Sequence, residues 1–321
     1  MTNAKPWKYR KVSIVGAGAV GSTFAYALAQ SGLASEIAII DRNQELARGQ
    51  VLDLLHGVPF FPSVEIHAGE QRDYADSQVI VITAGSKQSQ GETRLDLLQR
   101  NASIIEAIVD DILHERSQAI LVIVSNPVDV LTYVALKRSG WDKSRVIGSG
   151  TVLDSARFRY ALSRHCDVDV RNVHAYILGE HGDSEVAAWS MTHIAGVPID
   201  DYCPFCKRCG NWEEEKSRIV EEVRNSAYHI IDYKGATFYA IGLALVSIVG
   251  AILRNQRSVL TVSNLLDGEY GMKDVCLSVP CVLSERGIEH IIEAKLMPHE
   301  QEALSNSGSI LRSALLELGH G

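Results

Sequence analysis

The chain has 321 residues, of which 46% are hydrophobic and 22% charged, a balance typical of a globular protein with room for two domains. Its net charge of −8 has no basic block, which argues against nucleic-acid binding. The longest uncharged stretch, 235–253, contains glycines and hydroxyl side chains, so we interpret it as a buried helix rather than a membrane span. Because no signal-peptide core follows the polar N-terminus, we expect a cytoplasmic location and reduced cysteines.

The N-terminal region carries a nucleotide-binding pattern. A short β-run, Lys11–Val15, leads through glycines into the alanine-rich helical stretch Ser22–Gln30, and a second β-run, Glu36–Ile40, ends at Asp41. The glycine pattern between the first strand and the helix is G-x-G-x-x-G, formed by Gly16, Ala17, Gly18, Ala19, Val20 and Gly21. Strand, glycine turn and helix in this order are typical of a dinucleotide-binding unit.

The glycines and the acid each have a chemical reason. Gly16 permits the turn, Gly18 lets a pyrophosphate approach backbone N–H groups, and Gly21 lets helix and strand pack closely. Asp41 can accept hydrogen bonds from both ribose hydroxyls and would repel a 2′-phosphate, which favours NAD over NADP. Arg42 argues in the opposite direction, and a glycine turn without a ligand is the alternative interpretation.

Strands and helices alternate over the rest of the first half. Further strands are predicted at Val64–His67, Gln78–Thr83, Ala119–Val124 and Arg145–Ile147. A helix is predicted at Arg48–His56, with an apolar stripe that faces the body or a partner subunit, formed by Val51, Leu52 and Leu55. This alternation predicts a doubly wound parallel sheet of the Rossmann type over residues 1–148.

Ligands of such sheets bind beyond the carboxyl ends of the strands. We therefore expect contacts to the cofactor from Asn126 and from the strand end that comprises Thr83, Ala84 and Gly85. The polar stretch Ser86–Arg94 is predicted to be a mobile loop before a helix that starts near Leu95. It could close over the cofactor and carry Arg94 into the site; the alternative is a solvated loop.

Residues 149–321 are predicted to form an α+β substrate domain with antiparallel strands. Helix 151–159 presents Asp154 and Arg157 three residues apart on one face, the spacing also of an ordinary surface ion pair. Strand Val173–Leu178 leads to a turn with His181 between two glycines, where an imidazole can exchange a proton. A histidine that merely occupies a turn is the alternative.

The remaining elements complete this second half. The amphipathic helix Trp212–Tyr233 is predicted to continue into the apolar stretch Gly235–Leu253. Antiparallel strands follow at Ser258–Ser263 and Val275–Val282, and a helix from Pro298 to about Leu318 ends the chain.

Five motifs carry a family resemblance. They are Gly16-Ala-Gly-Ala-Val-Gly21, Gly91-Glu-Thr-Arg-Leu95, Ser125-Asn-Pro-Val-Asp129, Gly150-Thr-Val-Leu-Asp-Ser-Ala-Arg157 and Gly179-Glu-His-Gly-Asp183. In order and spacing the chain resembles the bacterial L-lactate dehydrogenases of the lactate/malate dehydrogenase family over nearly its whole length. The resemblance implies an NAD-dependent L-2-hydroxy acid dehydrogenase that interconverts pyruvate and L-lactate in glycolysis and fermentation.

The resemblance also implies catalytic roles that agree with the side-chain chemistry. His181 would protonate the pyruvate carbonyl oxygen, and Asp154 would hold the imidazole tautomer and favour its charged form. Arg157 would bind the substrate carboxylate with its planar two-donor fork. Arg94 would polarise the carbonyl as negative charge develops.

The substrate pocket is expected to include three further residues. Asn126 would hydrogen-bond near the carbonyl and the nicotinamide, and Thr237 would line the far wall. Gln88 stands where malate dehydrogenases of the family carry arginine, so it favours the methyl group of pyruvate over a second carboxylate; the adjacent Lys87 is the residue that could undermine this interpretation. Malate dehydrogenase is the alternative within the family, and a catalytically silent NAD-binding regulatory protein is the alternative outside it.

Two more residues match an effector site of bacterial lactate dehydrogenases. Arg159 and His174 stand where those enzymes bind fructose 1,6-bisphosphate across a subunit interface, and both side chains suit phosphate. The resemblance thus implies an allosteric homotetramer activated by this sugar; two ordinary surface cations are the alternative.

One stretch departs from the family pattern. Cys203, Cys206 and Cys209 form two overlapping Cys-x-x-Cys steps in a turn-rich segment. Zinc, a redox pair and three reduced surface thiols are the interpretations, and the last is the one we favour, with no metal expected.

Overall fold

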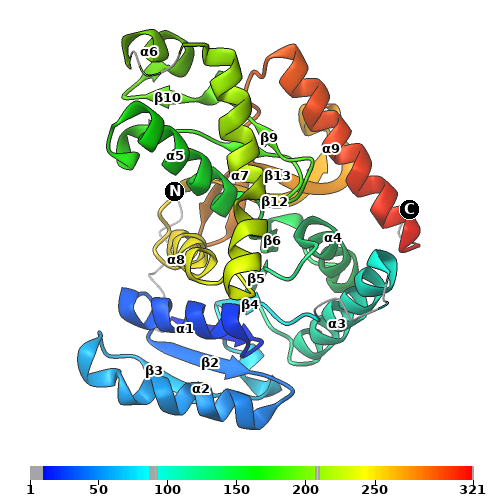
Figure 1. Cartoon of the computed structure of the whole chain (residues 1–321). Coiled ribbons are helices and arrows are strands. Elements are labelled where there is room, and N and C mark those ends of the chain that lie inside the picture. Colours follow the sequence, from blue (N-terminus) through cyan, green and yellow to red (C-terminus); the bar gives the residue numbers. More distant parts are fainter. Residues whose placement is uncertain (1–9, 87–90, 92, 207, 209, 320–321) are drawn as a thin grey trace, which may run out of the picture.

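The structure, a computed structural model of the chain, describes residues 10–86, 91, 93–206, 208 and 210–319, without the side chains of residues 204–206. Its centre is a nine-stranded sheet of order β14-β13-β12-β6-β5-β4-β1-β2-β3 (Figure 1). Six of these strands are parallel: β1 (Lys11–Val15), β2 (Glu36–Ile40), β3 (Glu65–Ala68), β4 (Val79–Ile82), β5 (Ile120–Ile123) and β6 (Val146–Gly148). Their order confirms the predicted Rossmann-type sheet.

The parallel strands are apolar because both faces of the sheet are covered. Every residue of β1, β4 and β5 is buried. The connecting helices are α1 (Ala19–Ser31), α2 (Gln44–His56), α3 (Arg94–His114) and α4 (Val128–Ser139). Of these, α3 packs against α4, and α1 packs against the later helix α8 (Tyr239–Leu253). The predicted elements of this half agree with the observed ones to within a few residues.

The antiparallel strands of the second half extend the same sheet. They are β12 (Ser258–Asp267), β13 (Lys273–Ser284) and β14 (Gly287–Ile291), and β12 joins β6 through the pair Ser263 and Gly148. This pairing covers the edge of β6, which would otherwise leave backbone groups without partners. The predicted antiparallel character is confirmed, although β12 and β13 are longer than predicted and β14 was not anticipated.

The predicted strand 173–178 is wrong as a single element. It divides into β7 (Val173–His174) and β8 (Ile177–Leu178), which belong to different small sheets. In the first sheet, β7 pairs with β10 (His193–Ile194), and β10 also pairs with β11 (Val197–Pro198). In the second sheet, β8 pairs with β9 (Val186–Ala187). An apolar run shows that a segment is buried, but it does not show which strand pairs with it.

The predicted continuous helix 212–253 is also wrong. The helix α7 (Trp212–Lys234) ends at Gly235, whose φ of 82° is left-handed and closes the helix, and α8 begins four residues later. No helix in the described part of the chain is long and apolar enough to cross a membrane. The remaining helices are α5 (Val152–Cys166), α6 (Ile199–Cys206) and α9 (Pro298–Glu317). Short 3-10 turns lie at η1 (Val58–Phe60), η2 (Gln71–Tyr74), η3 (Lys143–Arg145), η4 (Val170–Asn172), η5 (Trp189–Met191) and η6 (Glu269–Gly271).

Candidate active site

The turn that carries His181 is held by three distant elements. Gly179 exchanges two backbone hydrogen bonds with Ser278 of β13, at 2.9 and 3.0 Å. Ser307 of α9 accepts the next N–H at 2.8 Å, and Asp129 of α4 accepts the N–H of His181 at 2.8 Å. Gly179 has a φ of 89°, and a Cβ there would lie 2.8 Å from the Ser307 hydroxyl, so only glycine suits this position. The imidazole is therefore presented from a fixed backbone.

A carboxylate on α5 joins the imidazole to a guanidinium. Asp154 Oδ2 lies 2.5 Å from Nδ1 of His181, and Asp154 Oδ1 accepts a hydrogen bond from Arg157 at 2.7 Å. The Asp154 side chain is 3% exposed, against 14% for Arg157 and 26% for His181. The pair on α5 is thus buried rather than a surface ion pair, and His181 does not merely occupy a turn.

This arrangement shifts the protonation of both partners. Burial, the largest influence on His181, lowers its pKa, but the carboxylates Asp154 and Asp129 outweigh burial and raise the pKa to about 9. Burial likewise raises the pKa of Asp154, but His181 and Arg157 outweigh it and hold that pKa below its ordinary value. The site therefore holds an imidazolium beside a carboxylate at neutral pH, with Nε2 left to exchange a proton.

Asp129 belongs to this site, although sequence reasoning assigned it no role. Its carboxylate is buried beneath the turn, where burial raises its pKa to about 6. The signal was present, because Asp129 closes the motif Ser125-Asn-Pro-Val-Asp129, but nothing in the spacing connects it to a residue 52 positions later.

The glycine turn after β1 forms an open cradle at the start of α1. Asp41 Oδ2 accepts the N–H of Ala17 at 2.7 Å, which holds the carboxylate beside the turn. A Cβ at Gly21 would lie 1.9 Å from the carbonyl oxygen of Gly16, whereas a Cβ at Gly18 would meet no atom within 4 Å. Gly18 therefore borders open space in front of the helix N-terminus, where N–H groups and the helix dipole suit a diphosphate. The cradle fits the nucleotide predicted from the sequence.

A second loop system lies beside this cradle. The Thr83 hydroxyl donates to the carbonyl of Gly16 at 3.1 Å, and thereby ties the end of β4 to the glycine turn. Asn101 of α3, which sequence reasoning missed, accepts the N–H of Ser86 at 2.8 Å and donates to the carbonyl of Asn126 at 3.0 Å. Asn101 therefore joins the loop that contains Ala84 and Gly85 to the loop that contains Asn126, and both loops are predicted to contact the cofactor.

The predicted mobile loop is only partly described. Gln88 lies outside the described residues, so its role as a specificity residue stays a prediction. Arg94 is the exposed first residue of α3, and its charge acts on Tyr228, whose hydroxyl donates to Asp183 in the His181 turn at 2.8 Å. Thr237 lies half-buried in the link between α7 and α8. Arg94 and Thr237 are thus on separate elements, and their roles also stay predictions.

The two predicted effector residues line one pocket. Arg159 of α5 and His174 of β7 border a cavity of about 200 Å³, together with residues of β12. His174 is exposed, and the Nε of Arg159 has no hydrogen-bond partner among the described residues. The structure therefore brings together two side chains that the sequence separates by 15 positions, in a pocket that already holds two donors for an anion.

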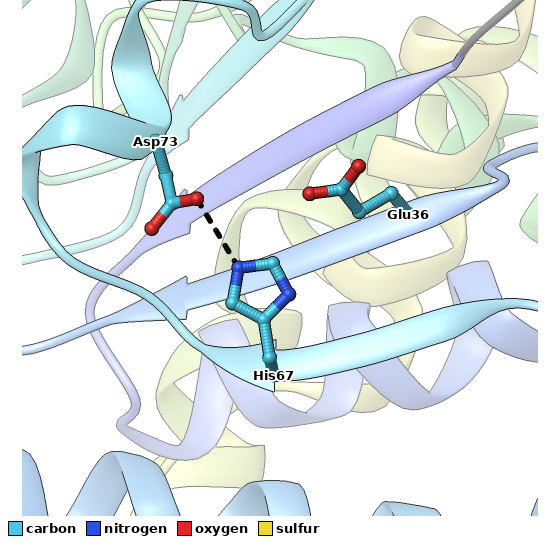
Figure 2. Close-up of side chains that lie close together, drawn as sticks. All are labelled: Glu36, His67 and Asp73. Atoms are coloured by element: carbon cyan, nitrogen blue, oxygen red, sulfur yellow. Dashed lines mark hydrogen bonds and ion pairs between the residues drawn. The ribbon is translucent and has the colours of Figure 1, made fainter.

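A cluster with metal-ligating side chains lies elsewhere, at the start of the parallel strands. Figure 2 shows Glu36 of β2, His67 of β3 and Asp73 of η2 converging, with His67 Nε2 3.2 Å from Asp73. The ammonium of Lys11, on the neighbouring strand β1, lies 3.1 Å from Glu36 and 2.8 Å from Asp73. Burial lowers the pKa of Lys11, but the carboxylates outweigh burial and hold that pKa above its ordinary value, so this cluster already contains its own cation.

The interpretation of three surface thiols needs correction for Cys203. Its side chain is only 2% exposed, and its Sγ lies 4.0 Å from Nε2 of His165 on α5. Cys209 and the side chain of Cys206 lie outside the described part of the chain. The four cysteines whose side chains are described, Cys166, Cys203, Cys276 and Cys281, are all buried.

Relatives with assigned names match almost the entire chain. An L-lactate dehydrogenase of Treponema denticola is 62% identical over 311 residues, covering 97% of this chain and 99% of that protein. An L-lactate dehydrogenase of Acetivibrio thermocellus is 54% identical over 311 residues, covering 96% and 97%. Among solved structures, the ligand-bound minor L-lactate dehydrogenase of Enterococcus mundtii is 44% identical with a TM-score of 0.93, covering 96% of this chain and 98% of that one.

Family models match the two halves separately. Residues 10–148 match the NAD-binding domain of the lactate/malate dehydrogenases, and residues 151–319 match the α/β C-terminal domain of the same family. The cofactor is therefore NAD, in agreement with the cradle at Gly18 and the carboxylate of Asp41. Fold, site geometry and these matches show together that the chain belongs to the lactate/malate dehydrogenase family.

Proposed function

We propose that this protein is an L-lactate dehydrogenase, which reduces pyruvate to L-lactate with NADH and catalyses the reverse reaction. The observation that carries the proposal is the buried carboxylate of Asp154, which contacts His181 at 2.5 Å and Arg157 at 2.7 Å. It places a proton donor and a carboxylate-binding group side by side. The names of the relatives from Treponema denticola and Acetivibrio thermocellus support the same substrate.

Each side chain has a defined task in this reaction. Arg157 binds the substrate carboxylate with guanidinium nitrogens other than the one bonded to Asp154. The imidazolium of His181 donates its Nε2 proton to the carbonyl oxygen and regains it when lactate is oxidised. Arg94 stabilises the negative charge that develops on that oxygen. The chemistry that NADH supplies when bound is the hydride.

The substrate preference rests on Gln88. A neutral side chain at the start of the loop suits the methyl group of pyruvate, whereas oxaloacetate would bury a second carboxylate without a cation. NADH oxidation followed with each acid tests this directly, and pyruvate should have the higher kcat/KM. Gln88→Arg should move the ratio of the two values toward oxaloacetate by about 10–100-fold, the worth of one charge-assisted hydrogen bond.

A matched control separates charge from position. Gln118→Arg adds the same charge at an exposed position just before β5, outside the predicted specificity loop, and should leave the ratio near that of the wild type. A wild-type protein that already prefers oxaloacetate would instead support malate dehydrogenase, the alternative within the family.

We further propose that the protein is a homotetramer activated by fructose 1,6-bisphosphate. The pocket between Arg159 and His174 supports an anionic effector, because a subunit of charge −8 needs local cations to bind a bisphosphate. Exposed apolar side chains on α1, α2 and α8 support subunit contacts. They include Tyr26, Leu52, Leu55, Tyr239 and Leu243.

A further inference from the structure

A second ionisable group lies beside the catalytic pair. Glu185 follows His181 by four residues, immediately before β9, and its side chain is buried with a residue exposure of 7%. Its Oε1 is one of the buried oxygens without a hydrogen-bond partner in the described part of the chain. A buried carboxyl group with an oxygen that has no hydrogen-bond partner is costly when it is charged and much less costly when it is protonated.

Four charged groups act on this carboxyl from three directions. They are Asp154 and Arg157 on α5, His181 in its own turn and Arg224 on α7. The α9 helix also packs against β9, but its buried acid, Glu300, already accepts two hydrogen bonds from Ser190. The carboxyl therefore belongs electrostatically to the catalytic pair and to the substrate arginine, rather than to solvent.

Arg224 does not neutralise Glu185 by a direct ion pair. Its Nη2 donates to the backbone carbonyl of Glu185 at 3.4 Å, and its Nε is buried without a hydrogen-bond partner among the described residues. Burial and the nearby carboxylate of Asp154 raise the pKa of Glu185 to about 8, although His181 and both arginines oppose this. Near neutral pH the group therefore carries a proton.

We propose that Glu185 is a positioning residue of the substrate site, whose proton is required before the carboxylate of a 2-oxo acid can bind at Arg157. The inference rests on the proposed function, because it assumes that Arg157 receives that carboxylate. With Glu185 neutral and His181 charged, the five groups carry a net charge of about +2, from three cations and one anion. Ionised Glu185 adds a second anion whose charge acts on Arg157 and so weakens the attraction of the site for the substrate carboxylate.

The pH dependence of kcat/KM tests this. Substrate binding in the wild type needs two protons, on Glu185 and on His181, whose pKa values are about 8 and about 9. Well above both, each further pH unit should lower kcat/KM for pyruvate about 100-fold, because two ionisations act together. The Glu185→Gln variant has no ionisable group at this position, so each further pH unit should lower kcat/KM only about tenfold. The difference from the wild type should appear in KM rather than in kcat.

Two further variants separate charge from structure. Glu185→Asp keeps an ionisable group and should restore the steeper dependence. Arg224→Gln removes a cation that favours the ionised carboxyl, so the Glu185 step should move to higher pH. The control is Glu222→Gln, which removes a carboxylate at an exposed position of α7 and should leave the profile unchanged. A Glu185→Gln profile as steep as that of the wild type would overturn the proposal.

Proton uptake gives a measurement that does not depend on turnover. Calorimetric titration of the NADH complex with oxamate, an unreactive analogue of pyruvate, in buffers of different ionisation enthalpy counts the protons taken up. At pH 9.5 the wild type should take up between one and two protons per site and Glu185→Gln fewer than one; equal values would contradict the proposal.

If oxaloacetate proves the preferred substrate, the proposed function fails, but the slopes measured with oxaloacetate still decide the role of Glu185, because both acids carry the same carboxylate.

Discussion

At the scale of single residues, Asp154 controls the proton on His181. The buried carboxylate of Asp154, which lies 2.5 Å from the imidazole, raises the pKa of His181 to about 9 and so keeps the imidazole charged below that pH. Asp154→Asn keeps the shape but removes the charge, so the pKa of His181 should fall by about 1–3 units. The alkaline decline of pyruvate reduction should begin correspondingly lower, which a pH profile of kcat/KM measures.

The control for this variant is Asp169→Asn. The carboxylate of Asp169 forms an exposed ion pair with Arg171, and the guanidinium of Arg171 holds the pKa of this carboxylate at about 2. Asp169→Asn removes the same charge outside the site, so kcat/KM should decline over the same alkaline pH range as in the wild type. An unchanged profile in Asp154→Asn would mean that another group sets the proton on His181.

At the scale of elements, the glycine motif at the turn between β1 and α1 includes Gly21 and Gly18, whose substitutions should affect folding and cofactor binding separately. Gly21 has no room for a Cβ, which would lie 1.9 Å from the carbonyl oxygen of Gly16. Gly21→Ala should therefore force the helix from the strand and lower the free energy of unfolding by about 1–3 kcal/mol, with weaker NADH binding as a consequence. Denaturant unfolding and NADH fluorescence measure the two effects.

Gly18 is the matched contrast in the same turn. Its φ of −71° and ψ of −172° are accessible to alanine, and a Cβ there meets no atom within 4 Å in the free protein. Gly18→Ala should thus unfold at the same denaturant concentration as the wild type while losing NADH affinity, because the methyl group occupies the place of the diphosphate. Equal NADH affinity in the variant would show that the diphosphate does not approach Gly18.

At the scale of the whole molecule, the exposed apolar side chains and the pocket between Arg159 and His174 are the features that support the proposed assembly. Tyr26 of α1 is 53% exposed, and Leu243 of the adjoining α8 is 66% exposed, on helices that pack together (Figure 1). Such side chains on neighbouring helices favour burial against another subunit. An effector that binds one arrangement of subunits better than another would then shift the population and activate the enzyme.

The corresponding test combines activation with assembly. The wild type should sediment as a tetramer, and fructose 1,6-bisphosphate should raise its pyruvate reduction. Exchanging both pocket cations, Arg159→Gln with His174→Ala, should bring the ratio of activities with and without the sugar to about one, because two phosphate contacts are lost. Arg164→Gln, an exposed residue of the same helix, is the control and should keep the activation. Activation that survives in the double variant would place the effector elsewhere.

Local spacing was enough to predict much of this protein. The strand, glycine turn and helix around Gly18 follow from residues adjacent in sequence, because the turn needs conformations that glycine supplies. Asp154 and Arg157 share a face of α5 because three residues are nearly one helical turn. The same reasoning placed His181 at a bend after a strand, and the chain order of strands and helices predicted the parallel sheet.

Spacing within the sequence did not decide which distant residues meet: the resemblance implied the pairing of Asp154 with His181, and the tertiary structure added the others. The contact of His181 with Asp154 spans 27 positions, and its bond to Asp129 spans 52, so no periodicity could predict either. The division of 173–178 into two strands was likewise set by partner strands from elsewhere in the chain. The protonation of Glu185 depends on burial and on charges from α5 and α7. Sequence therefore determined the elements and their chemistry, whereas packing decided their partners and protonation, because burial and electrostatic fields arise only when separate elements come together.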